Sequence, residues 1–186
     1  MEKDVRMMAG GIEVELNNNG VLEPGLHKIT FGEFYETFVE KFPSSQRRKE
    51  IFDSLFEFIK VLTTEYEIYE VWVDGSFVTE KINPNDIDII IFLEVSSFLK
   101  IKSKWSDIRS LGKNNNIDAY CEVAVSEESK KLISPEVLQA IINRRNYWRG
   151  QFGFDRVDNP KGIIVISAEE IRSNLKGGDI NVNGSN

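Results

Sequence analysis

The sequence predicts an α/β (α+β) fold in which a mixed sheet of about four or five strands packs against helices. Apolar residues recur every three to four positions over 31–42 and 45–65, which is typical of helices with one buried face. Short β-rich runs indicate four strands, at 68–73, 86–94, 117–125 and 162–166. The second of these runs is apolar on both faces beyond Asp88, so we expect helices to cover the sheet on two sides.

The length of 186 residues indicates one domain, residues 1–178, followed by a flexible polar tail at 179–186. Within it we expect a hairpin and helices at 12–65, a core at 66–125, and a helix and strand at 134–175. No stretch of about 18 apolar residues and no signal peptide is present, so we expect no membrane partner. A single cysteine gives no disulfide framework, which is typical of a reducing cytoplasm.

The net charge of −7 argues against broad, sequence-independent DNA binding. Basic residues nevertheless gather in the C-terminal third of the chain, between Lys130 and Lys161. A local basic surface for nucleotide phosphates, or for RNA, is therefore an open alternative.

The N-terminal part predicts a loose lead-in over 1–11, a small hairpin over 11–22, and two helices. Thr30 and Glu33 have the spacing of a capping box for the first helix, which Pro43 ends. The second helix has an apolar stripe that starts at Ile51, and we expect both stripes to be core. Its charged residues are expected on the wet face: Arg47, Arg48, Lys49, Asp53, Glu57 and Lys60.

Later segments predict three more helices. One amphipathic helix around 98–108 ends at Gly112 and the asparagines that follow. Ser134-Pro135 opens a helix to about Trp148. Its expected apolar stripe is Val137, Leu138, Ile141, Ile142 and Trp148, and Arg145 falls within it, so that it either snorkels or faces a site. Ser167 and Glu170 cap a short last helix that ends at Gly177-Gly178.

Asp86 and Asp88 are the strongest candidate metal ligands. They lie two apart in a β-rich run, so both carboxylates leave the same face of a strand. Asp86 follows Asn-Pro-Asn and has an alternative as a turn cap, but Asp88 lies inside an apolar strand, where an unpaired carboxylate is costly. Because all the ligands are hard oxygens, Mg²⁺ is favoured over Zn²⁺, and Mn²⁺ is a second choice.

The strand at 117–125 carries two further acidic candidates. Asp118 and Glu122 share one face, and strand rise separates them by about 13 Å, so one of them at most meets the same metals. Asp118, near the start of the strand, is our choice, with Glu122 as the alternative.

Gly75 and Ser76 form a turn that offers backbone donors and a hydroxyl to a phosphate. Lys81 is a candidate phosphate contact, with a solvated loop lysine as the alternative. Four basic residues are candidate contacts to a nucleotide or to a molecule that accepts part of it, and each could instead be a surface or structural residue. They are Arg145, Arg149, Arg156 and Lys161. We expect Asp74 to be a turn residue, and Cys121 and His27 to be structural.

The spacing of these residues resembles the nucleotidyltransferase superfamily related to DNA polymerase β. Gly75-Ser76, nine further residues, Asp86-Ile-Asp88 and a later strand Asp118 form its signature. A wider set of motifs resembles a family of short, largely uncharacterised bacterial and phage proteins described as nucleotidyltransferase-like, over roughly 21–166. The motifs are Glu23–Lys28, Phe31–Phe34, Arg47-Arg48, Asp74–Thr79, Lys81, Pro84–Asp88, Tyr147-Trp148, Phe152–Phe154 and Pro160–Ile163.

The resemblance implies a polymerase-β-like fold with extra N-terminal helices and a minimal transferase domain. It implies that Asp86, Asp88 and Asp118 hold two Mg²⁺ ions on a nucleoside triphosphate. A nucleoside monophosphate then moves to a hydroxyl of a protein, RNA or small molecule, in a toxin–antitoxin or phage-defence setting. The alternative is a catalytically silent nucleotide-binding or interaction module, such as an antitoxin. A minimal form also implies a second copy or a partner protein that completes the acceptor pocket.

Overall fold

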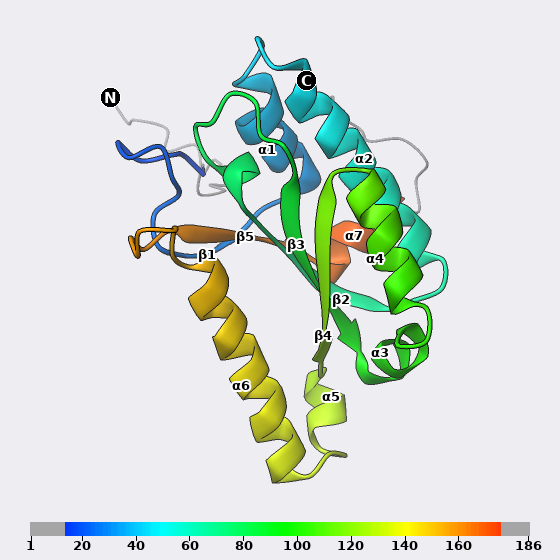
Figure 1. Ribbon diagram of the computed structural model, residues 1–186. Helices are drawn as coiled ribbons and strands as arrows, with labels where there is room; N and C mark the ends of the chain where they lie inside the picture. The colour runs from blue at the N-terminus through cyan, green and yellow to red at the C-terminus, as the bar shows by residue number, and fades with distance from the viewer. Residues whose placement is uncertain (1–13, 176–186) are drawn as a thin grey trace, which may run out of the picture.

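The computed structural model describes residues 14–175, which form a mixed five-stranded sheet with helices on both faces (Figure 1). The strand order is β1-β5-β2-β3-β4. The strands are β1 (Gly25–Lys28), β2 (Ile68–Asp74), β3 (Ile87–Glu94), β4 (Ile117–Ala124) and β5 (Gly162–Ser167). The pairs β1–β5 and β3–β4 are parallel, whereas β2 is antiparallel to both β3 and β5. The mixed α/β architecture expected from the sequence is therefore confirmed.

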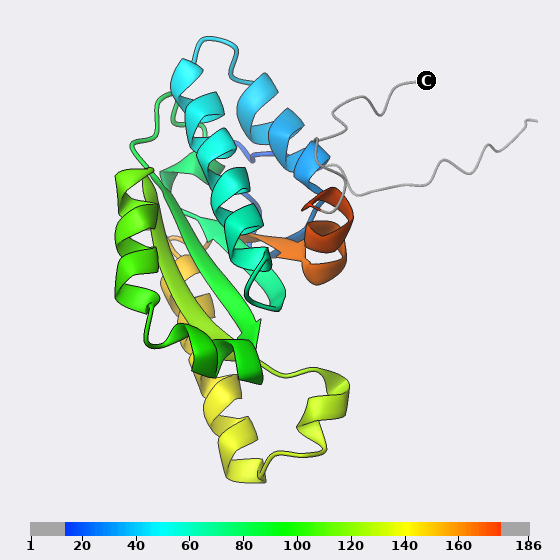
Figure 2. The same cartoon turned by 90° about the vertical axis from the view of Figure 1, so that its right-hand side faces the viewer.

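Helices cover both faces of the sheet. The described helices are α1 (Phe31–Tyr35), a π-helical turn η1 (Glu36–Glu40), α2 (Gln46–Thr63), a 3₁₀ turn η2 (Ser76–Val78), α3 (Val95–Ile101), α4 (Trp105–Asn114), α5 (Glu127–Lys130), α6 (Pro135–Phe152) and α7 (Ala168–Leu175). Figure 2 shows α2 in front of the strands and α6 behind them. No helix within residues 14–175 is both long and apolar enough to cross a membrane.

Two apolar clusters form on the two faces of the sheet. The larger contains Val71 and Ile89 and joins the sheet to α1, η1 and α2. The smaller contains Trp72 and Ile90 and joins the opposite face to Trp148 of α6. Successive residues of a strand point to opposite faces, so the continuous apolar run in β3 serves both clusters.

Several elements differ from the expectation. The helix at 31–42 divides into α1 and η1, and the single helix around 98–108 is two helices, α3 and α4. The four-residue strand β1 and the short α5 were not predicted. The hairpin over 11–22 is represented in the described residues by a bridge between Leu16 and Leu22. Residues 1–13 and 176–186, including the expected lead-in, helix end and tail, lie outside the described part.

The expectation for α6 was wrong in part. Of its expected apolar stripe only Trp148 is buried, whereas Val137 and Ile142 are exposed. Figure 1 shows the reason, because the first turns of α6 extend beyond the sheet together with α5. The last turns of α6 therefore provide the contact with the core.

Candidate functional site

Three aspartates form a row across one end of the strands β2, β3 and β4. Asp74, the last residue of β2, pairs with Asp88 of β3, and Asp88 pairs with Asp118 of β4. Paired residues on neighbouring strands share one face, so the three side chains lie on the same face as Trp72 and α6. Asp86 lies directly before β3. We expected Asp74 to be a turn residue, which was wrong: it is a buried strand residue.

Gly75 follows Asp74 and closes tightly over Asp88. Its φ of +82° lies in the region that favours glycine, and a Cβ atom there would lie 2.0 Å from Oδ2 of Asp88. No other residue fits without displacing the carboxylate. The next residue, Ser76, begins η2, so the turn between β2 and η2 is held against the acidic row.

A cavity of about 630 Å³ lies over Asp74 and Asp88 of the acidic row. It brings together Gly75, Ser76, Lys81, Asp86, Asp88, Arg156 and Lys161 from the predicted candidates. Asp118, Arg145 and Arg149 do not line it. Its remaining lining includes Asp74 and four aromatic residues, Tyr120, Trp148, Phe152 and Phe154. The cavity thus has a charged side and an aromatic side.

Lys161 connects the acidic row to the C-terminal part of the chain. It is buried, and its Nζ lies 2.5 Å from Oδ1 of Asp74. Burial raises the pKa of Asp74 to about 6, although Lys161 and the Gly75 amide oppose the rise. Burial and the negative charges of Asp86 and Asp118 raise the pKa of Asp88 to about 6, and Lys161 and Arg156 oppose it. Asp86 and Asp118 therefore add repulsion to the cost of burying the Asp88 charge, and a cation beside Asp88 would offset both.

Asp118 is engaged at the side of the cavity. Its Oδ2 accepts a hydrogen bond from the Tyr120 hydroxyl at 3.0 Å, and its Oδ1 lies 3.5 Å from Nη2 of Arg109. Oδ1 is nevertheless buried without a hydrogen-bond partner, as is Nε of Arg109. One carboxylate oxygen of Asp118 is therefore left without a full complement of donors.

Glu122, the alternative to Asp118, belongs to a different arrangement. Its Oε1 accepts from Arg144 and, at 2.7 Å, from Nε1 of Trp148. Arg145 pairs in the same way with the buried Glu70 of β2 and stacks over the rings of Trp72 and Phe92. Both arginines thus anchor α6 to the sheet, and neither is among the residues that line the cavity.

The loop at 153–161 carries Arg156 to the cavity. Asp155 fixes it, because its carboxylate accepts from the amides of Val157 and Asn159 and from the Asn159 side chain. A backbone bridge between Phe154 and Pro160 closes the loop. Arg149 lies instead in a neighbouring hollow with Leu26 and Phe154. A sequence signal for the loop existed in the Asp-x-x-x-Asn spacing, which we did not interpret.

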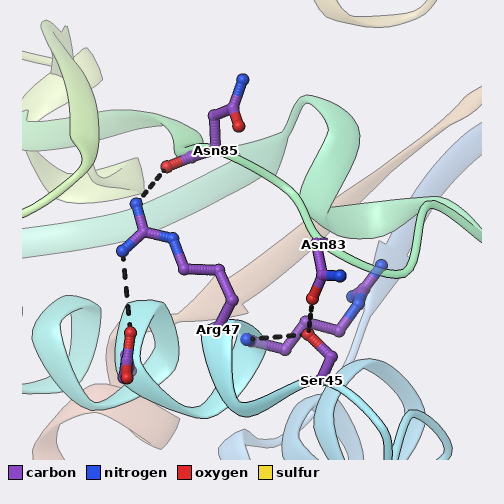
Figure 3. A network of polar contacts seen from close by, with 6 residues as sticks. Ser45, Arg47, Asn83 and Asn85 are labelled. Atoms are coloured by element: carbon purple, nitrogen blue, oxygen red, sulfur yellow. Dashed lines mark hydrogen bonds and ion pairs between the residues drawn. The ribbon is translucent and has the colours of Figure 1, made fainter.

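The N-terminus of α2 holds the segment between Ser76 and Asp86 from the other side. Arg48 is fully buried, so its assignment to the wet face was wrong. It donates to five backbone carbonyls, those of Phe38, Phe77, Thr79, Lys81 and Ile82. Figure 3 shows the outer contacts, in which Ser45 bonds to Asn83 and Arg47 to the carbonyl of Asn85.

Cys121 and His27 have structural surroundings, as expected. Burial and Glu122 raise the pKa of the Cys121 thiol to about 12, which makes it a poor nucleophile at neutral pH. Nε2 of His27 lies 2.6 Å from the carbonyl oxygen of Glu23, beside the start of β5.

The acidic residues suit a magnesium ion that arrives with a phosphate ligand. Within residues 14–175, no three His, Cys, Asp or Glu side chains gather closely enough to hold a metal ion by themselves. Mg²⁺ is commonly bound by one or two carboxylates together with substrate phosphates and water. Asp86 and Asp88 provide two such carboxylates in the cavity, beside Ser76 and three cationic side chains.

The comparisons with known proteins give one match. Residues 14–167 match the profile of a family described as a family of unknown function, DUF6932. No curated protein and no solved structure matches the chain.

Proposed function

The chain belongs to DUF6932, and because that family is one of unknown function, we propose the function from the site itself: a Mg²⁺-dependent nucleotidyltransferase. It transfers a nucleoside monophosphate from a nucleoside triphosphate to a hydroxyl of a protein, RNA or small molecule. The observation that carries the proposal is the single cavity that joins the Gly75-Ser76 turn to Asp86 and Asp88. The proposed fold is that of polymerase-β-like transferases, and the antiparallel β2–β3 pair followed by the parallel β4 supports it.

Each group has a distinct proposed role. The Gly75-Ser76 turn holds the β- and γ-phosphates, since glycine lets the phosphates approach the backbone closely. Lys81, Arg156 and Lys161 add positive charge to the same cavity. Asp86 and Asp88 hold the magnesium. The metal, when bound, neutralises charge on the phosphate oxygens and lowers the pKa of the attacking hydroxyl.

The proposed reaction is a displacement of pyrophosphate at the α-phosphorus. The acceptor oxygen forms a bond to the α-phosphorus, and the bond from this phosphorus to the bridging oxygen of the β-phosphate breaks. Pyrophosphate leaves with that electron pair, and the hydroxyl proton passes to a carboxylate. Asp118, the third carboxylate that the resemblance implies, is the proposed acceptor of the proton, and this role requires its side chain to leave Arg109 and Tyr120 and turn toward the cavity.

A second candidate is a catalytically silent nucleotide-binding module of the antitoxin kind. The observation that favours it is the engagement of Asp118 by Tyr120 and Arg109, outside the set of residues that lines the cavity. A protein that keeps only Asp86 and Asp88 free retains the means to bind a magnesium–nucleotide complex. It lacks the third carboxylate for proton removal.

One experiment separates the two candidates. The protein is incubated with each α-³²P-labelled nucleoside triphosphate, Mg²⁺ and cell lysate, and label transfer and pyrophosphate release are measured. We expect Asp86→Asn and Asp88→Asn to lower transfer by about a hundredfold or more, since each removes a metal ligand. Asp107→Asn, an exposed aspartate of α4, is the matched control and should keep full activity.

The alternative outcomes are equally specific. Calorimetric binding of the magnesium–nucleotide complex without turnover of any of the four triphosphates supports the silent module. Transfer that persists in both Asp86→Asn and Asp88→Asn contradicts the proposed site. EDTA should abolish transfer by the unmodified protein, and Mn²⁺ should restore it.

A further inference from the structure

The aromatic side of the cavity lies next to the charged side, and the proposed phosphate site leaves it without a role. Tyr120, Trp148 and Phe152 form a packed aromatic floor, with ring centroids 4.8 Å apart for the first pair and 5.7 Å for the second. Trp148 and Phe152 are buried. These three rings contact one another and pack in or against the apolar cluster on this face of the sheet, so they have a structural reason to be present.

Phe154 differs from the other three rings. It lines the same cavity but is 44% exposed, and among residues 14–175 it stacks on no other ring. A single exposed aromatic residue is common on protein surfaces and carries no inference by itself. Phe154, however, lies at the start of the loop that Asp155 fixes, and its backbone bridges to Pro160. The loop thus holds the ring at the edge of the cavity.

The same loop brings a charge to the same cavity. Arg156, two residues after Phe154, lines the cavity and lowers the pKa of Asp88, so its positive charge acts on the acidic row. Phe154 and Lys161 also border the neighbouring hollow of about 380 Å³. One short loop therefore brings an apolar ring and cationic groups to one cavity.

We propose that Phe154 stacks on the base of a nucleotide whose phosphates occupy the charged side, so that the cavity selects nucleoside triphosphates over inorganic polyphosphates. This inference rests on the proposed function, because it takes the charged side as the triphosphate site. A cavity of about 630 Å³ lies within the usual range for small-molecule sites. An exposed, fixed aromatic face is a suitable platform for a base, since every base has a π-face.

The test compares two ligands with three linked phosphoryl groups, of which only one carries a nucleoside. Binding of α,β-methylene-ATP and of tripolyphosphate, each with Mg²⁺, is measured by calorimetry, so that turnover plays no part. We expect the unmodified protein to bind the nucleotide more tightly than tripolyphosphate. Phe154→Ala should weaken nucleotide binding about tenfold, within the usual range for one stacked base, and leave tripolyphosphate binding unchanged.

Three further variants separate stacking from loss of structure. Phe154→Trp should retain nucleotide affinity, because it keeps a flat aromatic face, whereas Phe154→Leu should lose it despite its apolar side chain. Val157→Ala is the matched control, since Val157 is 75% exposed in the same loop and does not line the cavity. It should change neither affinity.

The outcomes also distinguish this inference from the proposed function. If Phe154→Ala leaves nucleotide affinity unchanged, or weakens both ligands equally, base stacking on Phe154 is wrong and the phosphate site stands. If neither ligand binds the unmodified protein, both the phosphate site and the stacking platform are wrong. Equal affinity of the unmodified protein for both ligands also overturns the selection for a nucleoside.

Discussion

Asp88 lies between Asp74 and Asp118 in the sheet. A negative charge on Asp88 therefore raises the free energy of the folded state. Its pKa of about 6 lies above that of a carboxyl in an unfolded chain, near 4. Between about pH 4 and pH 6, Asp88 therefore holds a proton in the folded state but not in the unfolded state. The free energy of unfolding therefore gains a contribution below about pH 4 that is lost as the pH rises through about 6.

The first prediction concerns this pH dependence in the metal-free protein. In Asp88→Asn the contribution is absent, so the free energy of unfolding should rise less between pH 7 and pH 4 than it does in the parent. Since Asp88 is partly exposed, the difference in slope should stay below about 1 kcal/mol per pH unit. Urea unfolding in EDTA at each pH measures it, with Asp107→Asn as the control. Parallel pH profiles for parent and Asp88→Asn would contradict the assignment.

At the scale of single residues, features that depend on local spacing were predictable from the sequence, whereas features that depend on cross-strand pairing were not. The Asp86-x-Asp88 pair is predictable because two residues apart on a strand is a rule of the backbone. Asp74 was misassigned because its place depends on the register between β2 and β3 and on Lys161, 87 positions away. A register of that kind is fixed by the whole sheet rather than by the residues near Asp74.

The helix α2 acts on the site through its first turn. Arg48 closes the segment from Phe77 to Ile82 by donating to its carbonyls, and the ring of Phe42 lies 3.8 Å from its guanidinium carbon. Burial lowers its pKa to about 10, which still leaves it charged at neutral pH. The segment that carries Lys81 is therefore fixed by a helix that does not itself line the cavity.

The second prediction compares Arg48 with its neighbour Arg47. Arg48→Met leaves five carbonyls without their donor, of which those of Phe38 and Phe77 form buried bonds, so we expect a loss of about 3–5 kcal/mol in the free energy of unfolding. Arg48→Lys should lose nearly as much, because one ammonium cannot reach the same carbonyls. Arg47→Met removes a single bond to Asn85 and a surface ion pair with Glu50, and should lose about 1 kcal/mol or less. Urea unfolding measures all three, and equal losses for Arg47 and Arg48 would contradict the anchoring role.

At the scale of elements, long periodic helices were predictable and short or split ones were not. The stripe of α2 extends over eighteen residues, and its buried face follows the 3.6-residue period. The edge strand β1 has only four residues, and it forms a strand by pairing with β5, far along the chain. Periodicity also misled us at α6, because an amphipathic pattern does not reveal that the sheet ends before the helix does.

The arrangement of the whole sheet explains why the site combines distant parts of the chain. The last strand, β5, inserts between β1 and β2, next to the end of β2 where Asp74 lies. The loop that precedes β5 therefore reaches the cavity, and it brings Phe154, Arg156 and Lys161 to residues 74–88. The sequence predicted four of these strands but not β1, and the insertion of β5 between β1 and β2 was not predictable from the order of elements.

The last prediction concerns the ion pair that joins these two halves. Lys161→Met leaves the Asp74 carboxylate buried without its cation, so we expect a loss of about 3–5 kcal/mol in the free energy of unfolding at pH 8. Removal of Lys161 also removes the charge and the hydrogen bond that hold the pKa of Asp74 down, so this pKa rises further. The loss should therefore be smaller at pH 5, where Asp74 is protonated in the folded state. The double variant Asp74→Asn/Lys161→Met should recover most of the stability at pH 8, because no buried charge is left unpaired. Thermal and urea unfolding of the two single variants and the double variant at pH 5 and 8 measure the coupling. A loss in Lys161→Met that is independent of pH, or additive losses in the double variant, would show that the pair does not connect the two halves of the sheet.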